Sequence, residues 1–399
     1  MLTDTQLDNY ADVLLWGLKK SRIGKYRKNN IVMVRYDLAA LRLAEILQTK
    51  LLYLGINPVL RMNTTPRMEL DFFSIANPAQ LVFQAPGNKE LCRHLNGSIF
   101  LNAPELLTHL SAIDPRKIGK TALAMKPLRD IVNTREAAGA FGWTLCMVPT
   151  RELAKQAKLS CKEYTAQLIK ACYLNKPHPV KEWETLFTRA LSIKKWLNSM
   201  RVRSYRIESD STDLTVTPGE RRKWIGISGH NIPSFEIFLS PDWRGTKGTY
   251  YANLPSFRSG NYVEGVRLEF KNGSACMITA KVNKDFVVKQ LTMDKGANKV
   301  GEFSLTDKRF SKIDKFMANT LFDENHGGAY GNCHLALGAS YADTYDGSPA
   351  ELTPRKKKQL GFNDSALHWD LVNTEKKTVT ACLHSGKKVI IYEDGKFRF

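Results

Sequence analysis

Long apolar stretches are missing from this chain of 399 residues. A membrane-spanning helix needs about 18 to 20 consecutive apolar residues, and no window of the sequence approaches that length. Residues 1–6 (MLTDTQ) also lack the basic start and the apolar run that are typical of a signal peptide. We therefore expect a globular protein of the cytoplasm that does not enter a membrane.

Cysteine pairs and glycine-rich phosphate loops are missing as well. The seven cysteines are an odd number, lie far apart in the sequence and form no CxxC pair, which argues against a disulfide framework and a zinc ribbon. No GxGxxG or GxxxxGK[ST] motif follows any expected strand, so the first half of the chain is not expected to bind a nucleotide.

Acidic residues are scarce relative to basic ones. There are 39 acidic and 59 basic residues, which gives a formal net charge of +20. A charge of this size invites a nucleic-acid-binding interpretation, but the basic residues form short, separate clusters and no known nucleic-acid-binding module accompanies them. These clusters are Lys19 and Lys20, residues 221–223 and residues 355–358. A solvated basic surface and a phosphate-binding surface both remain open, and residues 353–359 are expected to form a mobile charged loop.

The two halves of the chain differ in their hydrophobic periodicity. In residues 1–200 helical and strand patterns alternate, which predicts an α/β N-terminal domain with a mostly parallel sheet and a helical bridge at its end. The expected elements include strands at 81–83 and 121–124 and helices at 104–110, 127–138, 160–171 and 181–200. In residues 201–399 short strands and turns prevail, including a hairpin turn at 271–274, which predicts an α+β C-terminal domain with a mixed or antiparallel sheet.

A histidine and an aspartate share one face of an expected strand at residues 365–372 (SALHWDLV). Alternation with period two places His368 and Asp370 on one face and Leu367, Trp369 and Leu371 on the other. Burying a polar pair of this kind is costly unless something binds it. A metal ion is one candidate, because imidazole and carboxylate two residues apart can reach one cation. A simple hydrogen bond between the two side chains near a strand end is the alternative.

Further carboxylates lie in apolar or glycine-rich segments of the second half. One glutamate lies inside the expected strand at 235–239, one follows Gly301, and one closes the LFDE segment. The whole set consists of Glu236, Glu302, Glu324, His334, His368 and Asp370. Four carboxylates and two imidazoles suit two divalent ions that share a bridging carboxylate. Taken singly, each glutamate is also compatible with a solvent-facing position or a helix cap.

These segments resemble the thermophilic-type two-metal aminopeptidases, the family that includes aminopeptidases T and S. The matching segments are residues 231–241 (NIPSFEIFLSP), 294–302 (DKGANKVGE), 321–325 (LFDEN), 334–341 (HLALGASY) and 363–370 (NDSALHWD). Residues 143–149, 160–164 and 211–214 fit the same family. The resemblance therefore covers nearly the whole chain, and the ordered set of Glu, Glu, His, Tyr and His-x-Asp makes it specific.

The resemblance implies a role for each member of the set. The implied metal ligands are Glu236, Glu302, His334, His368 and Asp370, while Glu324 is a further ligand or the general base and Tyr341 is a catalytic hydroxyl. It implies hydrolysis of the N-terminal bond of peptides with a free N-terminus, by a water that two divalent ions (Zn²⁺, Co²⁺, Mn²⁺ or Mg²⁺) activate. It also implies an α/β N-terminal domain, a metal-carrying C-terminal domain and a homodimer.

Two features depart from the resemblance. Ten residues lead from Glu324 to His334, more than the family commonly has, and the added residues 326–330 could displace Glu324 from the centre. The strongly basic charge is also unusual for the family, so its substrate preference does not carry over. The alternative function is a basic nucleic-acid-binding or peptide-binding protein with a structural or vestigial metal site.

Overall fold

The computed structural model describes residues 2–259 and 261–399 and divides into two compact units. Unit 1 contains residues 1–181 and 228–232, and unit 2 contains residues 182–227 and 233–399. The change of hydrophobic periodicity in the sequence predicts a boundary near residue 200. In the observed division the long helix α9 (Pro179–Ser199) belongs to unit 2 from Glu182 onward. Among the described residues, no helix is long and apolar enough to cross a membrane.

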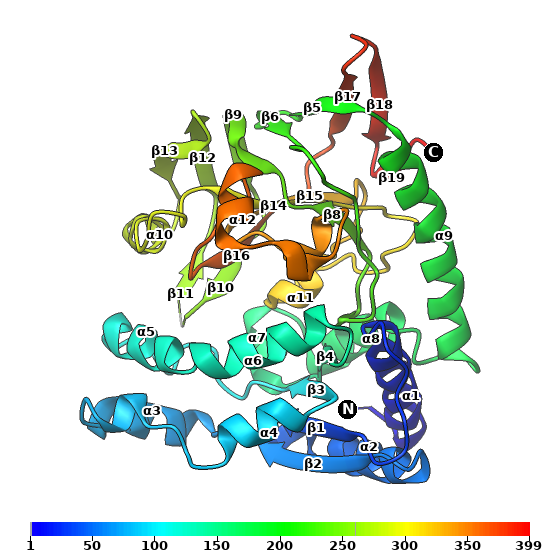
Figure 1. Cartoon of the computed structure of the whole chain (residues 1–399), viewed down its shortest axis with the longest axis vertical. Helices are drawn as coiled ribbons and strands as arrows, with labels where there is room; N and C mark the ends of the chain where they lie inside the picture. Colours follow the sequence, from blue (N-terminus) through cyan, green and yellow to red (C-terminus); the bar gives the residue numbers. More distant parts are fainter. Residues whose placement is uncertain (1, 260) are drawn as a thin grey trace. The chain divides into compact units, whose positions relative to one another are not determined.

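Unit 1 is built on a five-stranded parallel sheet in the order β2-β1-β3-β4-β7. Figure 1 labels β1 to β4 of this sheet. Its strands are β1 (Ile31–Tyr36), β2 (Asn57–Met62), β3 (Gly97–Asn102), β4 (Gly142–Met147) and the short β7 (Asn231–Ile232). Its helices are α1 (Asp4–Lys20), α2 (Leu41–Tyr53), α3 (Pro66–Ile75), α4 (Asn88–His94), α5 (Pro115–Ala124), α6 (Lys126–Ala137), α7 (Arg151–Gln156) and α8 (Cys161–Ala171), with 3₁₀ turns η1 (Leu38–Ala40) and η2 (Gln80–Val82). The predicted α/β class with a mostly parallel sheet is confirmed.

Helix α1 lies unusually close to the sheet of unit 1. It begins with a capping box formed by Thr3 and Gln6 and buries an apolar stripe that includes Tyr10 and Leu14. A Cβ at Gly17 would lie only 2.7 Å from the carbonyl oxygen of Gly229. Glycine therefore allows the close approach of this helix to the strand region.

Three local predictions for unit 1 are wrong. Residues 81–83 belong to the 3₁₀ turn η2 and its cap instead of a strand, and residues 121–124 complete helix α5. No helix forms at 104–110, where the chain makes bends and turns. Apolar runs of three or four residues are too short for their periodicity to separate strand from helix. The helix predicted at 160–171 is confirmed as α8, which begins with a capping box formed by Ser160 and Glu163.

Unit 2 contains two antiparallel sheets. The eight-stranded sheet has the order β13-β12-β9-β6-β5-β17-β18-β19, and the four-stranded sheet has the order β16-β15-β14-β8. The larger sheet consists of β5 (Val202–Glu208), β6 (Asp213–Thr217), β9 (Asp242–Ala252), β12 (Val266–Lys271), β13 (Ser274–Thr279), β17 (Thr378–Leu383), β18 (Lys388–Glu393) and β19 (Lys396–Phe397). The smaller one consists of β8 (Glu236–Leu239), β14 (Val300–Thr306), β15 (Asn332–Gly338) and β16 (His368–Asn373). The predicted antiparallel character of the second half is confirmed.

The remaining elements of unit 2 connect these strands. They are the hairpin β10 (Ser256–Arg258) and β11 (Asn261–Val263), helices α10 (Lys284–Leu291), α11 (Thr320–Asp323) and α12 (Pro354–Gln359), and the 3₁₀ turns η3 (Ala342–Thr344) and η4 (Pro349–Glu351). The hairpin turn predicted at 271–274 joins β12 to β13, with positive φ angles at Asn272 and Gly273. The charged loop predicted at 353–359 is wrong, because Thr353 caps helix α12 there.

The core of unit 2 lies between its two sheets. Phe303 of β14 is fully buried, and its ring lies 5.8 Å from that of Tyr205 in β5. The hydroxyl of Tyr250 in β9 shares its one proton between the carbonyl oxygens of Cys333 and Leu371, at 3.0 and 2.6 Å. One face of the four-stranded sheet is thus sealed against the larger sheet. The polar side chains of the smaller sheet project from its other face.

Candidate metal centre

The register of the four-stranded sheet brings polar residues from distant parts of the chain onto one face. In the pairing of β14 with β15, Glu302 lies opposite Ala336. In the pairing of β15 with β16, Ala336 lies opposite Asp370 and Gly338 lies opposite His368. Directly paired residues of antiparallel strands project to the same side, so Glu302, Asp370 and His368 share a face. The small side chains of Ala336 and Gly338 leave room between them.

Two further donors join this face from neighbouring positions. His334 of β15 lies opposite Ser304 of β14, two residues after Glu302. Glu236, the first residue of β8, lies opposite Thr306 of β14. The hydroxyl of Ser304 donates a hydrogen bond of 3.2 Å to Oε2 of Glu236. The candidate metal centre, as we call it from here on, consists of Glu236, Glu302, His334, His368 and Asp370.

Glycine residues make the backbone around the centre possible. The β14–β15 register shifts between Val300 and Glu302, and a Cβ at the intervening Gly301 would lie 2.2 Å from the carbonyl oxygen of Ala339. Gly338 has φ +105°, and its Cβ would lie 2.1 Å from the carbonyl oxygen of Leu367. Only glycine fits these positions, and the bulge at Gly301 turns Glu302 toward the centre.

Glu302 stands between the two imidazoles of the centre. Its Oε1 lies 3.2 Å from Nε2 of His334, and its Oε2 lies 3.6 Å from Nε2 of His368. Nε2 of His334 is also 3.2 Å from Oε2 of Glu236, and Nε2 of His368 is 3.5 Å from Oδ1 of Asp370. The five residues therefore form two groups of three donors, and Glu302 belongs to both.

The donor atoms meet the requirements of divalent metal ions. Ligand atoms about 2.1 Å from a tetrahedral ion are about 3.4 Å from one another, close to the separations observed here. Nδ1 of His368 lies 3.0 Å from the carbonyl oxygen of Ala339, which can only accept, so this nitrogen carries the proton and Nε2 offers its lone pair to the centre. Nδ1 of His334 is buried and has no hydrogen-bond partner among the described residues. The residues present fit a metal site.

Without metal, the buried carboxylates and imidazoles shift one another's protonation. Burial and the neighbouring carboxylate of Glu302 raise the pKa of Glu236 to about 8. Burial lowers the pKa of His334, but its hydrogen bond to Glu302 and the charge of Glu236 outweigh this effect and raise the value to about 9. Burial lowers the pKa of His368, but the charge of Asp370 outweighs burial and raises this pKa to about 9. Burial raises the pKa of Asp370, but the charge of His368 outweighs burial and lowers this pKa to about 2. Without metal, protons on Glu236 and on the two imidazoles thus offset the charge of the remaining carboxylates.

Glu324 lies beside the centre but outside its two donor groups. It follows helix α11, it is buried, and burial together with the charges of Glu236 and Asp370 raises its pKa well above the usual range. Asn332 donates hydrogen bonds from its amide nitrogen to the carbonyl oxygens of Glu324 and His326, at 2.9 and 2.7 Å. These hydrogen bonds hold the two ends of the additional segment 326–330 together, so the segment forms a loop. The Glu324 carboxylate remains close enough to interact electrostatically with Glu236 and Asp370.

Tyr341 contacts the centre through its ring. The centroids of the Tyr341 and His368 rings are 4.7 Å apart, and Phe238 lies on another side of Tyr341 at 5.7 Å. The residue as a whole is 43% exposed, so a substrate can reach it. The pKa of Tyr341 is raised well above the usual range, first because its hydroxyl is buried and then because the carboxylates of Glu302 and Asp370 lie nearby.

Three residues around the centre were not predicted from the sequence. Ser304 follows Glu302 at period two, so strand alternation could have placed it on the same face. Arg258 donates a hydrogen bond of 2.9 Å to the carbonyl oxygen of His368, and it comes from the distant hairpin β10–β11, for which the sequence holds no signal. Asn325 is fully buried and accepts a hydrogen bond of 2.5 Å from the backbone N–H of Phe235, the residue before Glu236.

Replacing Asn325 with alanine should destabilise unit 2. The amide of Asn325 also donates to the carbonyl oxygen of Leu321 at 2.9 Å, so alanine leaves a buried donor and a buried acceptor without partners. Each such loss costs about 1 to 3 kcal/mol, and we expect the free energy of unfolding to fall by about 2 to 6 kcal/mol. Urea unfolding followed by tryptophan fluorescence measures it. Asn261→Ala, which removes an exposed asparagine amide, is the control, and equal midpoints for the two variants would contradict the expectation.

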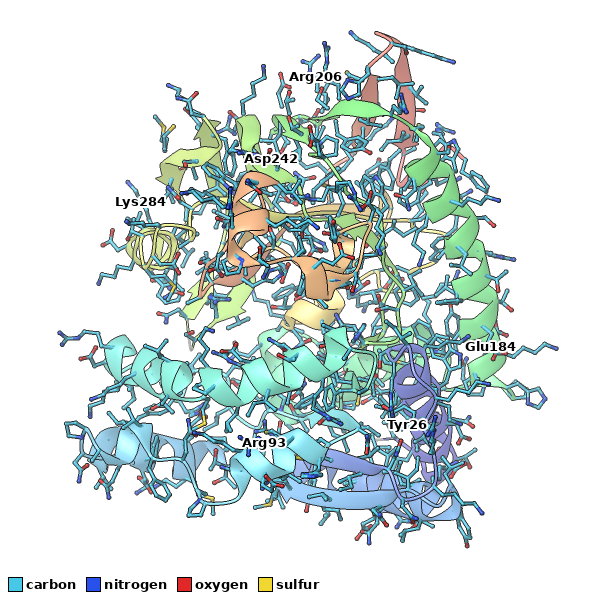
Figure 2. All side chains as sticks on the ribbon, in the orientation of Figure 1. Tyr26, Arg93, Glu184, Arg206, Asp242 and Lys284 are labelled. Atoms are coloured by element: carbon cyan, nitrogen blue, oxygen red, sulfur yellow. The ribbon has the colours of Figure 1, made fainter. Side chains whose placement is uncertain are left out.

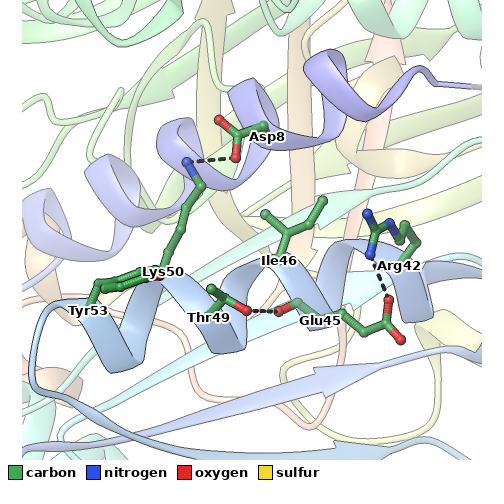
Figure 3. Close-up of a pocket in the computed structure, with 7 residues that line it drawn as sticks. All are labelled: Asp8, Arg42, Glu45, Ile46, Thr49, Lys50 and Tyr53. Carbon is green, nitrogen blue, oxygen red and sulfur yellow. Dashed lines mark hydrogen bonds and ion pairs between the residues drawn. The ribbon is translucent and has the colours of Figure 1, made fainter.

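A pocket of about 440 Å³ lies elsewhere, between helices α1 and α2 of unit 1 (Figure 3). Its lining residues are Asp8, Arg42, Glu45, Ile46, Thr49, Lys50 and Tyr53. Lys50 pairs with Asp8 at 3.0 Å and Arg42 pairs with Glu45 at 3.2 Å, as the dashed lines in Figure 3 mark. Its charges are satisfied by one another, and it contains neither histidine nor a carboxylate cluster. We therefore assign the chemistry to the centre in unit 2.

Comparison with known proteins agrees with this centre. A family model described as thermophilic metalloprotease (M29) matches residues 3–397. The chain is 28% identical to aminopeptidase PepS of Streptococcus thermophilus over 313 residues, 73% of this chain and 71% of the relative. It is 25% identical to aminopeptidase AmpS of Bacillus subtilis over 343 residues, 79% of this chain and 80% of the relative.

Solved structures show the same fold. The structure described as wild-type AmpT from Thermus thermophilus matches with a TM-score of 0.81 and 20% sequence identity, and the match covers 98% of this chain and 99% of that one. The family match, the relatives and the cluster of buried carboxylates and imidazoles agree with one another. The chain therefore belongs to the thermophilic metalloprotease (M29) family and is a metal-dependent aminopeptidase.

Proposed function

We propose that this aminopeptidase works with two divalent cations that share Glu302 as a ligand. One cation would be held by Glu236, Glu302 and His334, and the other by Glu302, His368 and Asp370. The observation that carries the proposal is the placement of the two oxygens of Glu302 against two different imidazoles. When bound, such cations polarise the scissile carbonyl and lower the pKa of water toward neutrality. The mixed nitrogen and oxygen donors suit Zn²⁺, Co²⁺, Mn²⁺ or Mg²⁺.

Two residues of the chain would then act on the substrate. Glu324 is the general base that accepts a proton from the attacking water and passes it to the leaving amine, which its buried position beside Glu236 supports. Tyr341 keeps its proton at neutral pH, and its hydroxyl donates a hydrogen bond to the oxyanion that develops on the scissile carbonyl. Its contact with His368 and its partial exposure place it where a bound peptide can meet it.

The substrates are peptides with a free N-terminus, as the names of the relatives support. We also propose that the protein is a homodimer, on the basis of the family resemblance. Light scattering in solution measures the oligomeric state.

Removal of metal should abolish activity, and a divalent cation should restore it. We expect exhaustive chelation to reduce hydrolysis of leucine 4-nitroanilide to background, because the donors alone offer no Lewis acid. Adding back Zn²⁺, Co²⁺, Mn²⁺ or Mg²⁺ separately identifies the effective ion, and elemental analysis should find two ions per chain. An N-acetylated peptide is the control, since it lacks the free amine.

Two results would count against the proposal. Full activity after chelation would contradict metal dependence as a whole. A fully active protein with one ion per chain would contradict the shared role of Glu302.

A further inference from the structure

Residues 341–363, which we call the rim loop, form a loop of the four-stranded sheet whose two ends lie side by side. The loop leaves after Ser340 and returns at Asn363, and these two residues are joined by backbone and side-chain hydrogen bonds of 2.9 Å. The side chain of Asn363 also donates to the carbonyl oxygen of Gly338 at 2.6 Å. Tyr345, Leu352 and Phe362 form a small buried core inside it. The rim loop is therefore a structured element with its own packing.

The rim loop begins and ends beside the candidate metal centre. Its first residue, Tyr341, contacts the ring of His368. The backbone just before it contributes the carbonyl oxygen of Ala339, which lies 3.0 Å from Nδ1 of His368. A peptide that binds with its N-terminal residue at the centre can therefore run along this loop. Because an extended chain covers about 3.3 Å per residue, three to six residues reach about 10 to 20 Å.

Helix α12 gives the rim loop a basic surface. Its sequence is PRKKKQ, with four consecutive cationic residues. Lys356 pairs with Glu351 at 3.2 Å. The other three, Arg355, Lys357 and Lys358, have no ion-pair partner in the part of the chain that the structure describes, and Arg355 and Lys358 are exposed. Their positive charge is available to a ligand.

Neighbouring arginines hold helix α12 in place. Arg222 donates a hydrogen bond of 2.8 Å to the carbonyl oxygen of Leu360, and its guanidinium lies 3.4 Å from the centre of the Phe362 ring. Arg244 donates to the carbonyl oxygen of Gln359 at 3.1 Å and pairs with Asp242, whose position Figure 2 labels. These contacts occupy the guanidinium groups of Arg222 and Arg244 and fix the C-terminal end of the helix. The unpaired cations of α12 thus stand on a fixed support.

We propose that helix α12 is an electrostatic subsite that selects peptides with acidic side chains a few residues after the cleaved bond. This inference rests on the proposed function, because it assumes that a peptide lies at the metal centre. Carboxylate side chains complement the three unpaired cations, and exposed ion pairs of this kind each change affinity by about two- to fivefold. Their attraction is screened by salt. This subsite gives part of the +20 net charge a role in substrate choice.

The test compares two variants on a matched pair of peptides. The first variant carries Arg355→Gln, Lys357→Gln and Lys358→Gln. The control variant carries Lys387→Gln and Lys388→Gln, which remove exposed charges from the end of the turn that precedes β18 and from the first residue of β18. The peptides are Leu-Gly-Gly-Asp-Asp-Asp and Leu-Gly-Gly-Asn-Asn-Asn. For the first variant we expect KM for the acidic peptide to rise about tenfold with kcat unchanged, while KM for the neutral peptide stays the same. The control should match wild type.

Salt and single substitutions provide an independent measurement. The preference of wild type for the acidic peptide should shrink as NaCl rises from about 50 to 500 mM, and the triple variant should show no such dependence. If the triple variant does not fold, Lys358→Glu is used, which should reduce the preference, while Lys358→Arg should keep it.

The possible outcomes separate this inference from the proposed function. Failure of wild type to cleave either peptide in the presence of metal would overturn the proposed function itself. Cleavage of both peptides with equal KM values in wild type and the triple variant would overturn only the subsite. An equal rise of KM for the acidic and the neutral peptide in the triple variant would also overturn the subsite, because it would show that α12 supports the site without selecting acidic side chains. Loss of tight single-stranded DNA binding in the triple variant, with unchanged peptide kinetics, would assign the surface to nucleic acid.

Discussion

Replacing Glu302 with alanine is expected to remove both cations and to lower kcat/KM by more than about 100-fold. Loss of a residue that only supports a metal ligand typically costs 10- to 100-fold in metal affinity or activity, so loss of a ligand shared by two ions should cost more. Glu302 is the one member of the centre that belongs to both donor groups. Elemental analysis should find close to no metal in the variant, while His368→Ala and Asp370→Ala should each lose metal mainly from one of the two positions.

The stability of the metal-free Glu302→Ala variant separates this explanation from simple unfolding. Glu302 is 3% exposed, and its Oε1 lies 3.2 Å from Nε2 of His334. Alanine removes this partner of a buried imidazole, so the metal-free variant should melt below metal-free wild type while it remains folded. The increase in melting temperature that metal binding produces should be lost altogether.

The control for Glu302→Ala is Glu269→Ala, which removes a half-buried glutamate of β12 outside the centre. It should keep both ions and full activity. A Glu302→Ala protein that retains two ions, or a metal-free form that is already unfolded, would contradict the assignment of a shared ligand.

Tyr341→Phe is expected to lower kcat by about 100- to 1,000-fold while both ions stay bound. Loss of one hydrogen-bond donor to an oxyanion has an effect of this size, because the donor acts mainly in the transition state. The ring of Tyr341 provides the contacts with His368 and Phe238, and phenylalanine preserves that ring. KM and metal content should therefore change little.

Steady-state kinetics together with elemental analysis tests the role of Tyr341. Tyr330→Phe is the matched control, because Tyr330 is 41% exposed, close to the 43% of Tyr341, and lies outside the centre. Metal loss in Tyr341→Phe would make this residue part of the metal site, and unchanged kcat would remove it from the mechanism.

The alternation of residues 365–372 was enough to predict the two faces of strand β16. Trp369 and Leu371 are nearly fully buried on one side, and His368 and Asp370 contribute to the centre on the other. The fold class of each half was also predictable, because alternating helices and strands require a parallel sheet while short strands with turns favour antiparallel pairing. These features depend on periodicities that the local sequence carries by itself.

The helix α12 shows where local reasoning fails. Its proline and four cationic residues predicted a mobile loop, yet Thr353 caps the helix and Arg222 and Arg244 hold its end. Those arginines are more than 100 positions away in the sequence. Because such contacts form only when the chain has folded, no local sequence pattern predicts them.

Residue types, strand periodicity and family resemblance thus led from the sequence alone to the five residues that the structure brings together as the candidate centre. Their arrangement was decided by the tertiary structure. Strand register places Glu302 opposite Ala336 and between two imidazoles, and the bulge at Gly301 turns it onto the correct face. A shift by one residue would move every side chain of a strand to the other side, and the pairing partners that prevent it lie up to 70 residues apart. The sequence determines which donors exist, and the pairing of distant strands determines that they meet.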